Sequence, residues 1–533
     1  MAGAILLPMA SLTGCMEETV PTQYVTQEQV IASPKAAESY AMGMPAFLLQ
    51  PGIVNLDWSF DLGYPGMMHI RDLMTGDMAM VYTGYDHFRP WELATAMGES
   101  YAYPQIVWNT YCQLVQTANL TIEAIDPEDE TPIKRYYYGA ALAFRAMAYL
   151  DMARWYEFLP NDMVEPVNSY GNNVLNLTVP IVTPEMTEDE ARVNPRATRQ
   201  EMLDFLIESL TTAEDYITAT TRPNKTMPDL AVVYGLKARA YMWVEDYAKA
   251  KEYAAKAIAA HSGTPTTEEQ WLSTTNGFNT LSTPSWMWGT QYTADMDVVT
   301  LASIYTWTSW ACNEFEGGYA GVGARNMIDA ALYKSISDED FRKLTFVAPK
   351  GSALEGKENF VDKNYLDDSW GWDPLQEYAS LKFKPGQGDM VNDNPGVVTS
   401  YPLMRIEEMY LIEAEAAAHS NAAEGKTLLE NFMKNYRYSS YTCPAGDVVD
   451  EIFKQKRIEF YGEGIIFFDY KRLNKSVTRH YEGTNWASAY QFNTNGRPAW
   501  MNYVIVQTEG NSNSAVREFN NPDPSDKYVT LGE

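Results

Sequence analysis

Cysteine and histidine are both scarce in this chain. Its 533 residues include four cysteines and five histidines. The cysteines lie far apart without a Cys-x-x-Cys spacing, which argues against a disulfide framework and against a zinc site. The histidines show no metal-ligand spacing, and the chain has neither a nucleophile elbow nor a phosphate-binding glycine loop. We therefore expect no catalytic residues and no cofactor, although acidic loops such as Asp367-Asp368 would permit a structural calcium ion.

Basic residues are also under-represented. The chain has 40 Lys and Arg against 70 Asp and Glu, which gives a formal net charge of -30. An acidic surface repels phosphate backbones and anionic lipid heads, so we expect no nucleic acid partner and no electrostatic attraction to lipid. Paired carboxylates arise often in such a composition, and we expect most of them on solvated helix faces.

Long apolar runs are missing beyond the N-terminus, where no stretch reaches the roughly 18 apolar residues of a spanning helix. The run at residues 4–10 has the length of the apolar core of a secretory signal. It leads to Leu12-Thr13-Gly14-Cys15, which resembles a bacterial lipobox. We therefore predict a lipoprotein signal peptide over residues 1–14, lipid on Cys15 and a lipid-anchored tether over residues 15–35. The alternative is an ordinary buried segment with a chance cysteine.

Helical periodicity dominates the rest of the chain. Thr198 stands where it would cap a helix over residues 199–217. Further on, two helices meet at Glu245-Asp246, and small residues in the second helix would let the pair approach closely, as in a tetratricopeptide repeat. These small residues are Ala250, Ala254 and Ala257.

The periodicity predicts a mostly α fold, a tetratricopeptide-like superhelix of helical pairs that supports long irregular loops with a few short strands. We place the pairs near residues 100–160, 199–260 and 401–437, within a single domain over residues 36–533, because repeats must stack to bury their apolar faces. The insertion near residues 262–400 is rich in Gly, Trp and Tyr. Loops of this length are usually functional, so we expect ligand binding there.

The stretch DEIFKQKRIEFYGEGIIFFDYKRL, residues 450–473, is the most specific part of the sequence. It resembles the C-terminal signature of the SusD/RagB family. The residues that carry this resemblance are Ile452, Arg457, Glu459, Phe460, Gly462, Glu463, Gly464, Phe468, Asp469 and Arg472. The segments MRIEEMYLIEAEA and WNTYCQLVQTANLTIEAI resemble earlier helices of the same family.

The acids of this signature could be read as catalytic. We instead expect Glu459, Glu463 and Asp469 to form ion pairs that fix a turn against the helical scaffold. Gly462 and Gly464 would allow a tight turn with positive φ between two helices.

The resemblance implies a cell-surface nutrient-binding lipoprotein of the outer membrane of Bacteroidetes. Such a protein would bind a glycan (an oligo- or polysaccharide) without cleaving it, and would deliver it to a partner SusC-like TonB-dependent transporter. Glu17 and Glu18 directly follow the lipobox. They resemble the acidic export signal that sends such lipoproteins to the cell surface.

Aromatic residues make up 13% of the chain, and two clusters of them mix with polar residues at residues 76–92 and 285–319. Rings pack against the C–H faces of sugars, whereas Asp, Asn and Arg bind their hydroxyls. The candidate ligand-binding residues are Asp77, Tyr82, Asp86, Phe88, Arg89, Trp91, Tyr292, Trp307, Trp310 and Tyr319. Among them we favour Trp91, Trp307 and Trp310 for the ligand surface, and we expect Trp286 and Trp288 in a buried strand.

Three other functions stay open at this point. A RagB-like protein of the same fold would bind peptides for uptake, with less need for exposed rings. A surface glycosidase would need two carboxylates at a defined separation across a sugar, which a sequence does not reveal. A tetratricopeptide scaffold inside the cell would recruit protein partners, but the lipobox and the C-terminal signature argue against it.

Overall fold

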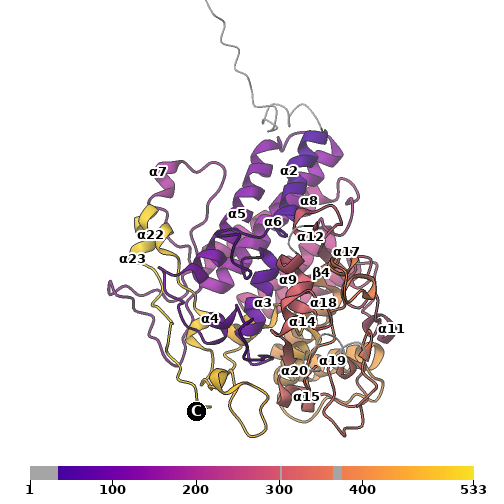
Figure 1. The fold of residues 1–533 in the computed structure, drawn as a ribbon. Helices are drawn as coiled ribbons and strands as arrows, with labels where there is room; N and C mark the ends of the chain where they lie inside the picture. The colour runs from indigo at the N-terminus through magenta and orange to yellow at the C-terminus, as the bar shows by residue number, and fades with distance from the viewer. Residues whose placement is uncertain (1–33, 301–302, 364–374, 533) are drawn as a thin grey trace, which may run out of the picture.

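The computed structural model describes residues 34–300, 303–363 and 375–532 (Figure 1). The expected signal peptide, Cys15, the tether up to residue 33 and Asp367-Asp368 lie outside these residues, whereas residues 34 and 35, expected in the tether, begin α2. The longer helices are α2 (Pro34–Phe47), α3 (Tyr64–Leu73), α5 (Ala102–Ala124), α6 (Pro132–Tyr156), α8 (Arg199–Ile217), α9 (Leu230–Trp243), α10 (Tyr247–Ala260), α18 (Ile406–Ser420), α19 (Ala422–Tyr436) and α20 (Val448–Glu459). Within the described residues, no helix has the length and apolarity needed to cross a membrane.

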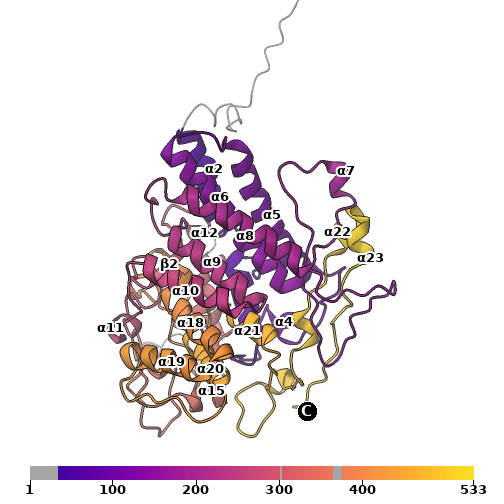
Figure 2. The ribbon, with the colours of Figure 1, turned by 180° about the vertical axis from the view of Figure 1, so that it is seen from behind.

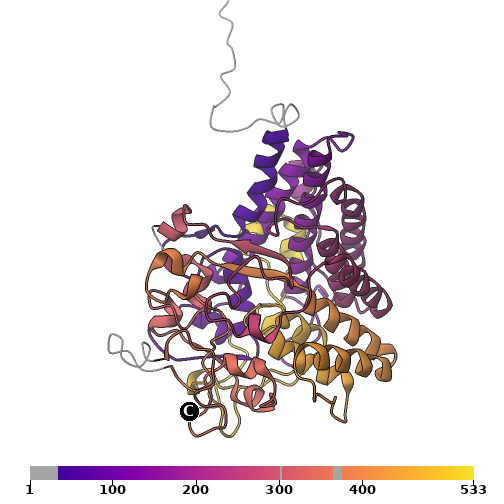
Figure 3. The same ribbon diagram turned by 90° about the vertical axis from the view of Figure 1, so that its right-hand side faces the viewer.

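The long helices pack against one another mostly in chain order. Helix α2 packs on α5 and α6, α6 on α8, and α8 on α9; α10 then packs on both α9 and α18, and α18 on α19. Figure 3 shows these helices gathered on one side of the molecule and the loop-rich segment on the other. The expected mostly α class, with long loops and few short strands, is confirmed.

Local sequence explains how several of these helices begin and meet. The side chain of Thr198 accepts a hydrogen bond from the Glu201 amide, and Glu201 in turn binds the Thr198 amide, so the predicted cap of α8 is confirmed. Helix α9 ends at Trp243 and α10 begins at Tyr247, on either side of the predicted junction. The three small alanines of α10 are buried, which permits its close packing on α9.

Short strands and loops make up the segment between α10 and α18. Strand β2 (Trp286–Gln291) pairs antiparallel with β4 (Ser400–Arg405), and β1 (Met78–Met80) pairs antiparallel with β3 (Asn326–Ile328). Trp286 and Trp288 are fully buried in β2, as predicted.

Short helices and 3-10 turns occur along much of the chain. The short helices are α4 (Arg89–Glu92), α7 (Glu188–Ala191), α11 (Glu268–Trp271), α12 (Asp297–Thr300), α13 (Trp307–Ala311), α14 (Tyr319–Val322), α15 (Ala330–Ser335), α17 (Asp393–Gly396), α21 (Ile466–Arg472), α22 (Gln507–Ser512) and α23 (Ser514–Glu518), with 3-10 turns η1 (Ser303–Tyr305), η2 (Phe341–Thr345), η3 (Gly386–Gly388), η4 (Ser488–Tyr490) and η5 (Ala499–Met501).

A buried carboxylate at the end of α20 holds three segments of the chain together. Glu459 is fully buried and binds Arg437 at 2.6 Å, Arg342 at 2.9 Å and Arg405 at 3.1 Å. We call these four residues the three-arginine cluster. Burial by itself opposes ionisation of Glu459, but Arg437 and Arg405 outweigh it and hold the pKa of that carboxyl far below its usual range. Arg342 comes from η2, Arg405 from the end of β4 and Arg437 from the end of α19.

The turn that follows α20 is fixed by two glycines. Gly462 and Gly464 have φ of 77° and 70°, which confirms the predicted positive-φ turn. A Cβ on Gly464 would come within 2.5 Å of the Cα of Met68, so the turn also lies directly against α3. Between the glycines, Glu463 binds Lys382 at 2.6 Å and Arg405 at 2.8 Å.

Replacing Glu459 by Ala should destabilise the protein strongly. Three buried guanidinium groups would lose their shared carboxylate, and breaking a buried ion pair typically costs about 3–5 kcal/mol. We expect a clear fall in the thermal and urea unfolding midpoints, and a smaller fall for Glu459→Gln, which keeps one hydrogen-bond acceptor.

Glu252→Ala is the matched control, because Glu252 pairs with Lys249 and Lys256 on the exposed face of α10. Its unfolding midpoint should not change measurably. Equal midpoints for Glu459→Gln and the wild type would contradict the structural role of the cluster.

Candidate functional site

The acids of the C-terminal signature are committed to ion pairs. Besides Glu459 and Glu463, Asp469 binds Arg472 at 2.7 Å and Lys456 at 3.1 Å. This confirms the structural interpretation of the signature. One detail differs for Glu459 and Glu463. Most of their partners are distant in sequence and come from the insertion and the helical stack, because these two acids are buried between those parts.

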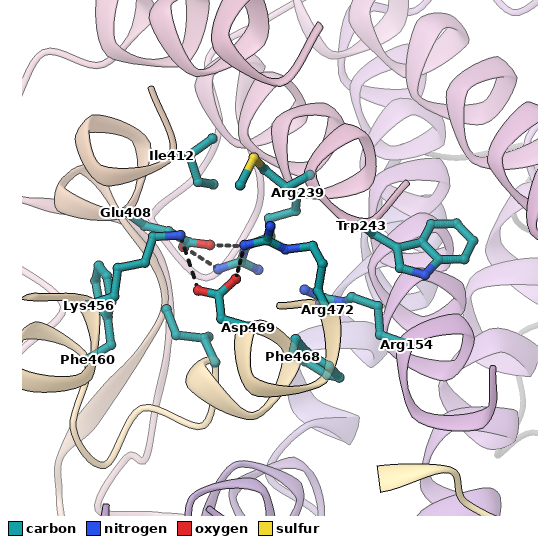
Figure 4. Close-up of a pocket in the computed structure, with 12 residues that line it drawn as sticks. Arg154, Arg239, Trp243, Glu408, Ile412, Lys456, Phe460, Phe468, Asp469 and Arg472 are labelled. Atoms are coloured by element: carbon teal, nitrogen blue, oxygen red, sulfur yellow. Dashed lines mark hydrogen bonds and ion pairs between the residues drawn. The ribbon is translucent and has the colours of Figure 1, made fainter. Parts of the chain in front are cut away.

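A small cavity lies beside these pairs (Figure 4). Its volume is about 50 Å³, which is room for one or two water molecules and too little for a sugar ring. Its wall includes a second closed pair, Arg239 with Glu408 at 2.6 Å. We therefore assign this cavity to the scaffold.

The three tryptophans favoured for the ligand surface are buried, so that expectation is wrong. Trp91 is 0%, Trp310 1% and Trp307 2% exposed. Trp307 packs against Phe383 and Tyr401, with ring centres 5.2 and 5.3 Å away. Indole is the largest apolar side chain, and long-range packing has drawn these three into the core. Because their faces are covered, a sugar cannot stack on them.

Four other candidate ligand-binding residues are also buried, so the expectation that they lie at the surface is wrong as well. Phe88 packs on Trp310, with ring centres 4.6 Å apart, and Tyr292 accepts a hydrogen bond from the Trp307 amide. Asp77 binds Arg457 at 2.6 Å and the Tyr470 hydroxyl at 2.8 Å. Asp86 lies inside the molecule near Glu92. None of these four side chains is placed to contact a ligand at the surface.

The three remaining candidates, Tyr82, Arg89 and Tyr319, lie at the surface. Tyr82 is 50% exposed, and the guanidinium of Arg89 lies over its ring, 4.5 Å from the centre. Tyr85, in the same loop, is 42% exposed. The Cδ2 atom of Tyr85 would lie 3.1 Å from a Cβ added to Gly323, so this loop lies against the end of α14.

Tyr319 of α14 continues this surface. Its ring is half-buried and stacks on Trp310, with ring centres 4.4 Å apart and an angle of 14° between the planes. The ring of His87 lies 4.7 Å from that of Tyr319, and its Nδ1 is hydrogen-bonded to the Ser59 hydroxyl. Burial lowers the pKa of His87, so its imidazole is neutral near pH 7.

Tyr305 joins the loop of residues 51–60 to the same area. Its hydroxyl donates a hydrogen bond of 2.5 Å to the Leu56 carbonyl. Burial and the proximity of Tyr319 raise its pKa. We call Tyr82, Tyr85, Tyr305 and Tyr319 the tyrosine surface. It offers ring faces together with hydroxyl, imidazole and guanidinium groups, a combination suited to a ligand with both apolar faces and hydroxyls.

The segment before α3 was missed entirely by the sequence reasoning, although it supplies Leu56 and the half-buried Trp58. The signal that could have found it is an aromatic residue in a turn-rich stretch, PGIVNLDWS, outside any helical stripe. The same signal separates Tyr82 and Tyr85, which lie in a loop outside any helix or strand, from Trp91 in α4.

Comparisons with solved structures define the class of this fold. A SusD-like carbohydrate-binding protein from Bacteroides vulgatus is similar over 91% of this chain and 97% of its own, with a TM-score of 0.68 and 21% identity. A SusD superfamily protein from Bacteroides thetaiotaomicron is similar over 91% of this chain and 98% of its own, with a TM-score of 0.66 and 17% identity. At these identities the likeness establishes the fold.

Sequence comparisons show similarity to SusD-like proteins in both halves of the chain. A family profile described as "Starch-binding associating with outer membrane" matches residues 68–242, and the SusD family profile matches residues 357–522. A SusD-like protein of Formosa agariphila is 25% identical over 401 residues, which is 69% of this chain and 72% of that protein. The chain therefore resembles the SusD/RagB family in both its N-terminal and its C-terminal half, in agreement with the prediction from its C-terminal stretch.

Two buried carboxyls lie beneath the tyrosine surface. Burial raises the pKa of Asp86 to about 6, and burial together with the Asp86 charge raises that of Glu92 well above its ordinary range. The charges of Arg89 and Arg479 act in the opposite direction on Glu92 without reversing it. The pair therefore holds a proton in the folded protein at pH values where the unfolded chain has released it.

This pair should make stability depend on pH. The contribution of Asp86 is complete below the ordinary Asp pKa of 3.8 and is lost as the pH rises through about 6. Asp86→Asn should remove the Asp86 part of this decline and raise the free energy of unfolding near neutral pH by on the order of 2 kcal/mol, whereas Glu92 stays buried and keeps its own part. Thermal unfolding from about pH 4 to about pH 8 measures it, with the exposed Glu128→Gln as control. A wild-type profile parallel to that of Asp86→Asn would contradict the assignment.

Proposed function

We propose that this protein binds a glycan at the tyrosine surface. The observation that carries the proposal is the pair of exposed rings at Tyr82 and Tyr85, beside Arg89, in a chain that matches the SusD family profile. Sugar rings present flat C–H faces that pack on tyrosine, and their hydroxyls bind guanidinium and phenol groups. Similarity to a SusD-like carbohydrate-binding protein of the same fold supports this choice over peptide.

The proposed task is capture without cleavage. The nearest carboxyl pair, Asp86 with Glu92, is buried and cannot reach a glycosidic bond at the surface. The acids of the C-terminal signature are paired with arginine and lysine. These arrangements support a binding protein over a glycosidase, because general acid–base catalysis needs carboxyls within reach of the substrate.

The wider proposal places the protein on the cell surface. Lipid on Cys15 would anchor it to the outer membrane, and a SusC-like TonB-dependent transporter would receive the captured glycan. The lipobox supports the anchor, and the family profile described as associating with the outer membrane supports the location.

Removing the exposed rings should weaken glycan binding. For Tyr82→Ala and Tyr85→Ala together we expect at least a tenfold loss of affinity, since ring contacts are worth about 0.5–1.5 kcal/mol each. Calorimetric titration of the full chain with defined oligosaccharides and with peptides measures this loss and separates the two cargo classes.

Tyr101→Ala is the control, because Tyr101 is also an exposed tyrosine but lies outside the tyrosine surface. It should bind as the wild type does. Binding of peptides in place of saccharides would sink the glycan proposal, and undiminished saccharide binding by the double variant would sink the site.

The anchor is tested separately. In cells that produce the full chain, Cys15→Ala should abolish incorporation of radiolabelled palmitate and release the protein from the outer-membrane fraction. It should not change saccharide affinity, because Cys15 is more than 60 residues away in sequence from Tyr82, the first residue of the tyrosine surface. Palmitate incorporation that survives the substitution would contradict lipidation at this residue.

A further inference from the structure

A second polar cavity lies at the C-terminal end of the chain, away from the tyrosine surface. Its volume is about 620 Å³, within the range of about 300–1,000 Å³ that small-molecule sites occupy. Helices α22 and α23, whose residues line it, lie beside α7 in Figures 1 and 2, and α14 lies well apart from them in Figure 1. The cavity shares no lining residue with the tyrosine surface.

The framework of this cavity is rigid. Asn168 donates hydrogen bonds to the carbonyls of Glu518 and Asn520 at 2.9 and 3.1 Å. Asn520 binds the Ile505 backbone in both directions, at 2.7 and 2.8 Å. Asn521 donates to the Tyr156 and Tyr503 carbonyls. Because these amides are committed to the backbone, the cavity is formed before any ligand arrives, which lowers the entropy cost of binding.

Several polar side chains that line the cavity have no hydrogen-bond or ion-pair partner in the part of the chain that the structure describes. Within the described residues, Gln507, Asn511, Arg517 and Lys527 line the cavity and form no side-chain hydrogen bond or ion pair. Tyr170 lines it as well and is 58% exposed. Its backbone is held by the side chain of Asn168, in the turn that presents the ring. A ring face beside free amides and a guanidinium repeats the chemistry of the tyrosine surface.

The charged residues of the lining indicate which class of ligand fits the cavity. Two cations, Arg517 and Lys527, and two carboxylates, Glu99 and Asp523, line the cavity, so the lining is neutral overall. A neutral lining with both donors and acceptors suits vicinal hydroxyl groups better than an anion or a cation. We propose that this cavity is a second binding site for a short neutral saccharide. The inference rests on the proposed function, since it takes saccharide as the class of ligand.

Calorimetric titration of the full chain tests the proposal. The titrants are the hexasaccharides of the malto, cello, xylo and laminari series, together with an acidic oligogalacturonate. The wild type should show two sites for at least one neutral hexasaccharide. Tyr170→Ala with Arg517→Ala should weaken one of them at least tenfold and leave the other. Arg192→Ala, an exposed arginine paired with Glu188 on the neighbouring α7, should leave both.

The outcomes separate this inference from the proposed function. A single site in the wild type that Tyr82→Ala with Tyr85→Ala abolishes would overturn the second site and keep the tyrosine surface. Binding that only the Tyr170 and Arg517 variant loses would support the cavity and reject the tyrosine surface. Binding of oligogalacturonate alone at the cavity would overturn its assignment to neutral saccharides. A chain that binds none of the titrants would reject both sites.

Discussion

The structure depends on one buried carboxylate that is shared by three arginines. Glu459 lies at the end of α20, and Arg342, Arg405 and Arg437 reach it from η2, β4 and the end of α19. A buried charge of either sign destabilises the fold unless it is paired. If one of these segments moved away, the charges that remain in the cluster would be left buried without that partner. The cluster therefore fixes the loop-rich segment and the C-terminal turn against the helical stack.

This arrangement explains how irregular loops can form a defined surface. The stack provides a rigid wall, and the buried tryptophans form a layer between that wall and the outermost rings. Trp310 lies beneath Tyr319, and Phe88 packs against Trp310 from the loop that carries Tyr82 and Tyr85. The indoles thus support the tyrosine surface from below, while the tyrosines, whose hydroxyls tolerate water, face the solvent.

Much of the fold could be predicted from the sequence because its signals are local. Helical spacing, the cap at Thr198 and the alanines of α10 each act within a few residues, and the structure contains all of them. The positive-φ glycines and the ion-paired acids of the C-terminal stretch were also predicted correctly.

The candidate site was predicted less well, because exposure is decided by contacts that are distant in sequence. Asp77 was expected to bind a ligand at the surface. It is buried instead, because it pairs with Arg457, which lies 380 residues further along the chain. Trp307 meets Phe383 and Tyr401 in the same way. The two aromatic clusters noted at residues 76–92 and 285–319 contain all four residues of the tyrosine surface, but the tryptophans favoured within them are buried.

Hydrogen–deuterium exchange of the full chain, with and without a saturating neutral oligosaccharide, tests the central claim most directly. Exchange should slow in the loop that carries Tyr82 and Tyr85 and in the segment from η1 to α14, and it should stay unchanged in α8, α9 and α10. Slower exchange confined to the helical stack, or no change in these two loops at a saccharide concentration that saturates binding, would contradict the account.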